Sequence, residues 1–199
     1  MNFFKKIFSS NKEENNHNKS SQEQTGIKEI FTDEYFAKRY NEINIDNEKN
    51  IVEGCFKMIE SYYLDNKIER NDQNTINHPA NLDQIVENGM GFHLYCKSFN
   101  QEDSQIIFML AYAFAEFLIK NNNFKFYKDS EPEFPMRSMT LKLDINGAVL
   151  SLYPFEYALK VLNNESKFES LHDKIKDQTQ NMPNMKDDFM NNLKEKINN

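Results

Sequence analysis

The first candidates for chemistry are His93 and Cys96, whose three-residue separation would place both side chains on one face of a helix. An imidazole beside a thiol can serve as base and nucleophile, but the base also needs a third group to orient it. The neighbouring sequence offers no Asp or Asn in that role, and two ligands are too few for a zinc site. The alternative is that Cys96 packs as a small hydrophobic residue, which is usual for a cysteine in an apolar helix.

The other candidate is Glu116, which lies inside the most apolar segment of the chain, residues 106–119. A buried carboxylate needs a cation or a proton, and functional acids often arise in this way. The alternative, which we favour, is that Glu116 faces water or pairs with Lys120 four residues on. Glu116, His93 and Cys96 are therefore the candidate functional residues, and we predict no catalytic set, no metal site and no cofactor.

The remaining polar residues indicate no further site. His17, His78 and His172 are predicted to be surface residues, as is usual for isolated histidines in polar surroundings. The loop carboxylates Glu131 and Glu133 are expected to be solvated, because a calcium loop needs closely spaced oxygen donors and a turn glycine. The five glycines are scattered and form no phosphate-binding loop, which argues against nucleotide-dependent catalysis.

Composition limits the choice of partner and compartment. The 199 residues carry a formal net charge of -7, whereas nucleic-acid binding requires clustered Lys and Arg. A basic protein partner suits such a surface better. Two cysteines are too few for a secreted disulfide framework, and no apolar run approaches the ~20 residues that cross a bilayer. We therefore predict a cytoplasmic protein without a transmembrane segment.

Both ends of the chain differ in composition from its middle. Residues 1–26 are predicted to be a disordered tail, because residues 9–26 are almost entirely polar. Residues 27–180 are predicted to form a single domain, and residues 181–199 a polar tail or marginal helix. The chain begins with a short amphipathic cluster beside two lysines, formed by Phe3, Phe4, Ile7 and Phe8. That cluster could touch a membrane surface or a partner groove, or it could be a frayed start without a role.

Apolar residues spaced by three and four predict several helices. Residues 32–40 resemble a capped helix start, residues 47–66 form an amphipathic pattern, and the segment 106–119 has so little polar face that it should be the buried centre. A further helix should begin at Pro79. Gly89 and the glycine two residues later weaken it, which favours a kink, a close helix crossing, or an end with a restart at Phe92.

The pattern then changes from helical to alternating. Asn146-Gly147 is the strongest hairpin signal, because both residue types tolerate the positive φ of a type I′ turn. Helices are expected again from Pro154 and around residues 168–175. The predicted class is α+β, a helix-rich domain with a small antiparallel three-stranded sheet. Its strands are expected near residues 124–128, 139–145 and 148–153.

The second half of the domain, roughly residues 106–175, resembles a bacterial family known as domain of unknown function 3806. The residues that carry the resemblance are Ala111-Tyr112-Ala113-Phe114-Ala115-Glu116-Phe117-Leu118, the strand Phe124-Lys125-Phe126-Tyr127, and Tyr153-Pro154-Phe155 leading into a helix with Lys160. The chain departs from that pattern in having Ala115 in place of Gly and Lys128-Asp129-Ser130 in place of an aromatic-rich turn. The resemblance implies a compact α+β domain of the kind that bacteria keep as toxin-neutralising partners, and it implies no catalytic residues.

Three functional hypotheses follow from these observations. The first is a non-enzymatic interaction protein, such as an immunity protein that blocks a toxin through an acidic face bearing aromatic residues. The second is an enzyme whose site is assembled from residues distant in sequence, with Glu116, His93 and Cys96 as candidates. The third is a membrane-proximal accessory protein held by Phe3 to Phe8.

Overall fold

One buried helix organises the fold. The computed structural model describes residues 37–145 and 147–182, and every structural statement below concerns these residues. Helix α6 (Asp103–Asn122) is buried at every position from Ile106 to Leu118, which confirms the predicted central helix. It begins at a capping box, in which the side chains of Glu102 and Gln105 each accept the other residue's backbone N–H.

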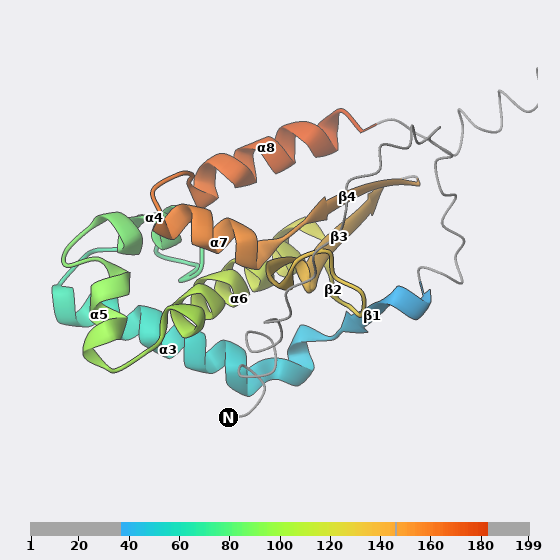
Figure 1. Ribbon diagram of the computed structural model, residues 1–199. Coiled ribbons are helices and arrows are strands. Elements are labelled where there is room, and N and C mark those ends of the chain that lie inside the picture. The colour runs from blue at the N-terminus through green and yellow to red at the C-terminus, as the bar shows by residue number, and fades with distance from the viewer. Residues whose placement is uncertain (1–36, 146, 183–199) are drawn as a thin grey trace, which may run out of the picture.

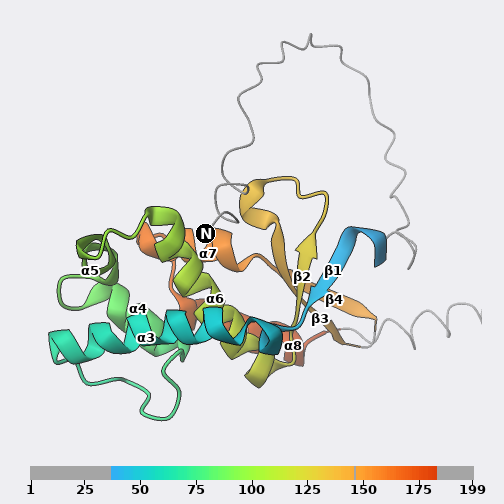
Figure 2. The same ribbon diagram turned by 90° about the horizontal axis from the view of Figure 1, so that it is seen from below.

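The other helices surround α6 (Figures 1 and 2). Helix α3 (Lys49–Asn66) runs along one side of α6 and follows the short 3-10 helix η1 (Ile45–Glu48) in the chain. Helices α7 (Pro154–Leu162) and α8 (Phe168–Gln180) lie on the opposite side of α6 from α3. Helices α4 (Pro79–Glu87) and α5 (Phe92–Ser98) are the remaining helices around α6, and α5 lies at the end of the molecule farthest from the sheet.

The chain between α4 and α5 ends one helix and starts another, which was one of the three outcomes that the glycines predicted. Gly89 has φ +64° and Gly91 has φ +80°, a left-handed conformation that other residues adopt only with strain. A Cβ on Gly89 would also lie 2.9 Å from Tyr62 Oη. Tyr62 Oη in turn donates to the carbonyl of Asn88 and accepts from Gly91 N–H at 3.0 Å. The turn is therefore fastened to the end of α3.

The sheet of the described residues has four antiparallel strands in the order β1-β2-β3-β4, not three. The three predicted strands are present with ends shifted by one residue at most, as β2 (Lys125–Asp129), β3 (Met139–Ile145) and β4 (Ala148–Leu152). The prediction that the first helix extends to Tyr40 is wrong, because this residue begins the edge strand β1 (Tyr40–Ile43). Strand β1 pairs with β2, far along the chain, so no local pattern reveals it.

The two faces of the sheet have different roles. Phe126, Leu141 and Leu152 are register neighbours on the inner face and are buried. The Phe126 ring meets the Tyr112 ring of α6 edge-on at 5.6 Å. The sheet and the helices therefore share one hydrophobic core. The outer face carries polar and aromatic side chains and is described below. The 3-10 helix η2 (Pro135–Arg137) lies in the connection between β2 and β3.

Several predictions concern parts of the chain outside the described residues. They include the disordered tail over residues 1–26, the cluster of Phe3, Phe4, Ile7 and Phe8, and most of the C-terminal segment 181–199. Each therefore stays a prediction, as does the single domain over residues 27–180. Over residues 37–145 and 147–182, no helix combines the length and the hydrophobicity required to cross a bilayer.

Candidate functional site

Glu116 is buried in α6 and has two partners. Its Oε2 accepts a hydrogen bond of 2.7 Å from Asn77 Nδ2, and its Oε1 forms an ion pair with Lys120. The predicted pairing with Lys120 is confirmed, but the expectation that this carboxylate faces water is wrong. The connection between α3 and α4 covers this side of α6, and Asn77 also donates to the Ala113 carbonyl at 2.7 Å. The carboxylate is thus held in place by its partners, and its burial is compensated as buried charges require.

Two histidine rings contact Phe117, the residue that follows Glu116 in α6. The His78 ring meets the Phe117 ring at 5.3 Å, and the His172 ring meets it at 5.1 Å, both edge-on. The two imidazole rings are 6.2 Å apart between centroids. The prediction that both histidines are surface residues is wrong for His172, which is 6% exposed, and only partly right for half-buried His78. Sequence reasoning missed this cluster because its members come from three separate segments.

This cluster of polar groups does not form a metal centre. Across the described ranges, no three His, Cys, Asp or Glu side chains converge closely enough to hold a metal ion. His78 Nδ1 is also occupied, because it accepts the Ala80 N–H at 3.2 Å and thereby caps the start of α4. The arrangement therefore ties the α3–α4 connection, α6 and α8 together.

His93 and Cys96 do not act together, although both belong to α5. His93 points outward, and its Nε2 lies 2.8 Å from Asp103 Oδ1. Cys96 is fully buried, and this burial raises the pKa of its thiol to about 12, so that the nucleophilic thiolate is scarce at neutral pH. Asp103 is an orienting carboxylate for His93 that the sequence analysis did not identify, but the Cys96 thiol faces the core.

Glu116 is also distant from this pair. It stands thirteen residues after Asp103 in the same helix, which corresponds to about 20 Å at 1.5 Å per residue. The three candidate residues therefore have separate partners and separate surroundings. Their positions give no support to a shared active site.

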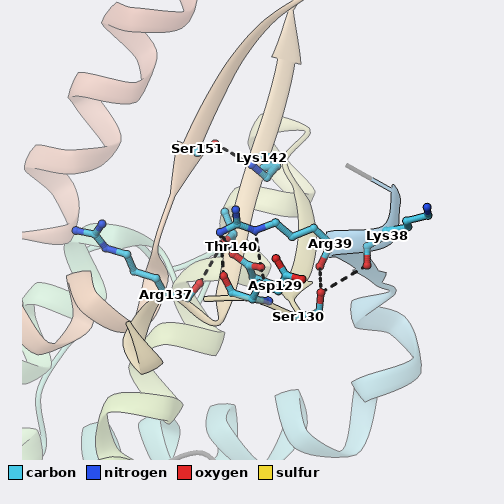
Figure 3. A network of polar contacts seen from close by, with 9 residues as sticks. Lys38, Arg39, Asp129, Ser130, Arg137, Thr140, Lys142 and Ser151 are labelled. Carbon is cyan, nitrogen blue, oxygen red and sulfur yellow. Dashed lines mark hydrogen bonds and ion pairs between the residues drawn. The ribbon is translucent and has the colours of Figure 1, made fainter. Parts of the chain in front are cut away.

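The outer face of the sheet holds an ion cluster that sequence reasoning missed (Figure 3). Arg39 donates two hydrogen bonds to the Asp129 carboxylate, from Nε to Oδ1 and from Nη2 to Oδ2, both 2.8 Å long. Burial disfavours the charged carboxylate, but Arg39 and the backbone N–H of Glu131 outweigh this effect, so that the pKa of Asp129 is lowered. The pair fastens the start of β1 to the end of β2, and its two members are ninety residues apart in sequence.

Lys142 lies in the same cluster on β3. Its Nζ is 3.2 Å from Ser151 Oγ on β4 and 4.2 Å from the centre of the Tyr40 ring on β1. Burial lowers the pKa of Lys142, nearby Asp129 opposes that shift, and Arg39 adds to it. A lysine with a lowered pKa is a candidate nucleophile, but here it also joins strands β1, β3 and β4. We interpret it as part of the bracing of the sheet.

A cleft of about 400 Å³ lies where α4 meets the start of α8. Within it, the carboxylate of Asp83 accepts the backbone N–H groups of Phe168 at 2.8 Å and Glu169 at 2.9 Å. Burial raises the pKa of Asp83, and these two N–H groups oppose the shift. Asp83 thus caps α8 from another helix, which is a structural role at a helix N-terminus.

The exposed apolar residues point to a different part of the molecule. Met90, Leu94 and Phe99, which we call the α5 surface, are 52%, 61% and 52% exposed. Met90 lies in the turn between α4 and α5, and Leu94 lies on the exposed side of α5. An exposed apolar cluster of this kind is typical of interaction sites.

The fold and these contacts define a helix-rich α+β protein with a four-stranded antiparallel sheet. Comparisons with known protein families, with curated proteins and with solved structures found no match to this chain. The resemblance to domain of unknown function 3806 therefore stays a prediction.

Proposed function

We propose that this protein acts by binding another protein through the α5 surface. The observation that supports the proposal most is the occurrence of three exposed large apolar side chains within residues 90–99, in and beside the short helix α5 at one end of the molecule. Leaving Leu and Phe in water forgoes the free energy that their burial would supply. Binding a partner would recover it.

The acidic balance of the whole chain favours a basic partner. Asp103 contacts α5 through His93 and Lys97, and its pKa is lowered by the hydrogen bonds from Lys97 and His93, so it is charged at neutral pH. Asp65 accepts a hydrogen bond from the Tyr95 hydroxyl of α5. The whole chain carries a net charge of -7. Complementary charge speeds encounter, while apolar contacts at the centre of an interface supply most of the affinity.

A toxin-neutralising role is the narrower form of this proposal. An immunity protein needs no catalytic residues of its own, and an acidic face with apolar anchors would suit a basic toxin. A cytoplasmic location belongs to the same proposal and is supported by two buried free thiols, Cys55 and Cys96. The separate surroundings of Glu116, His93 and Cys96 make the enzymatic alternative less well supported.

Site-specific photo-crosslinking in the native host tests the proposal. A crosslinking residue replaces Leu94 in one variant and Val149 in another, because Val149 is 54% exposed but lies on β4 at the other end of the molecule. We expect one discrete protein adduct from position 94 and none of the same mass from position 149. Identical adducts from both positions, or an adduct of the chain with itself only, would overturn the proposal of a distinct partner.

A further inference from the structure

The two histidines beside Phe117 belong to two different helices, and Phe117 belongs to a third. His172 belongs to the buried face of α8, together with Phe168 and Ile175. His78 is the N-cap residue of α4, and Phe117 belongs to α6. The near-perpendicular contacts among these three rings therefore hold α8 against both α4 and α6.

The geometry of His78 requires a neutral ring. Its Nδ1 accepts the Ala80 N–H, and a protonated imidazole has no lone pair left for this bond. Protonation would also place a positive charge at the N-terminus of α4, where the helix dipole opposes it. The cap of α4 is therefore lost when His78 takes up a proton.

His172 is also poorly placed to carry a charge. Burial lowers its pKa, and Lys176 and His78 act in the same direction, whereas Asp173 opposes them. The nearby carboxylate on α6, Glu116, is already engaged by Asn77 and Lys120. Asp83 on α4 is engaged by the first backbone N–H groups of α8. The carboxylates of Glu116 and Asp83 therefore already have partners, and Asp173 is the acidic group that acts on His172.

We infer that His78 and His172 form a proton-sensitive latch, which holds α8 against α4 and α6 at neutral pH and releases it on acidification. Once one of the two rings is protonated, its positive charge lies 6.2 Å from the centre of the other ring, in a half-buried site. Asp83 still caps the first turn of α8, but beyond His172 only Ile175 is buried. Release therefore begins in the C-terminal half of α8.

The direction of the pH effect follows from linkage. His172 has a lower pKa in the folded chain than in the unfolded chain, whose value is near 6.5. Its contribution to stability is fully present above that unfolded pKa and is lost as the pH falls from there through the folded pKa. The release of α8 is thus expected in mildly acidic solution, below about pH 6.5.

Hydrogen exchange of the full chain at pH 7.5 and pH 5.0, corrected for the intrinsic exchange rate, measures whether acid lowers the protection of the α8 backbone amides. In the native chain we expect the protection of residues 172–180 to fall about tenfold or more at the lower pH, because local opening of α8 becomes more frequent. The double variant His78→Asn with His172→Phe keeps a capping side chain and an aromatic ring but cannot titrate, so it should lose most of this response. The variant His93→Asn should respond like the native chain, because His93 contacts Asp103 instead.

An NMR titration of His172 in the native chain gives an answer that does not depend on any variant. We expect its imidazole to titrate below pH 6.5, over the same range in which α8 loses protection. The inference is overturned if α8 keeps its protection while His172 titrates, or if the double variant responds to acid as the native chain does.

Discussion

Helices α6 and α5 contain the same kinds of large apolar residue, but the two helices differ in how far these side chains are exposed. Leu110 and Phe114 of α6 are fully buried, whereas Leu94 and Phe99 in and beside α5 are more than half exposed. The difference arises at Gly89 and Gly91, where the chain turns and leaves Met90 and Leu94 exposed while Phe92 between them is buried. Large apolar residues thus build the core in α6, whereas some of those in and beside α5 stay exposed.

The same substitution in both helices should show this difference most clearly. Leu110→Ala should lower the free energy of unfolding by about 2–5 kcal/mol, because it leaves a cavity in a fully buried site. Leu94→Ala should change it by less than about 0.5 kcal/mol, as exposed positions do. The chain has no Trp, so urea unfolding is best followed by circular dichroism. Equal losses in the two variants would show that α5 is packed as tightly as α6.

The polar support of the buried helix should give the next largest effect. Asn77→Ala removes the amide that serves both Glu116 and the Ala113 carbonyl, and leaves these buried acceptors without that donor. We expect a loss of about 1–3 kcal/mol in the free energy of unfolding. The exposed Asn50 is the matched control, since its replacement by Ala should leave stability nearly unchanged. A neutral result for Asn77→Ala would mean that water replaces the amide without cost.

The turn that separates the two kinds of helix should give the smallest of the three effects. Gly89→Ala forces a side chain into a left-handed conformation and against Tyr62 Oη, so we expect a loss of about 1–2 kcal/mol. Gly54→Ala in α3 has open space around the new Cβ and should instead stabilise the chain by about 0.5–1 kcal/mol. Thermal unfolding of both variants checks the opposite signs. If Gly89→Ala were neutral, the turn would not depend on this glycine.

These contrasts also show which features were accessible from sequence. The apolar run of α6 and the alternation of β3 and β4 arise from near neighbours, and both were predicted with nearly correct bounds. Strand β1 and the Arg39–Asp129 pair depend on residues ninety positions apart, and nothing in residues 37–43 indicates such pairing. His172 looked like a surface residue because its neighbours in sequence are charged, yet its helical face packs on Phe117.

For the candidate residues, the chemistry of each side chain was predictable from its type, but the direction in which it points was not. The three-residue spacing of His93 and Cys96 suggested one face, but α5 lies at the boundary of the core, so the thiol is buried and the imidazole exposed. The pairing of Glu116 with Lys120 was predictable from their four-residue spacing. Asn77, the other partner, was not predictable, because it comes from a connection without a regular pattern.

The affinity of the crosslinked partner for three forms of the purified full chain tests the central claim most directly. The forms are the native chain, Leu94→Glu and Val149→Glu, because each substitution puts a charge in place of an exposed apolar side chain without disturbing the core. We predict a dissociation constant at least about tenfold higher for Leu94→Glu, a loss of about 1.4 kcal/mol, and an unchanged value for Val149→Glu. Equal affinities for all three forms would contradict binding through the α5 surface.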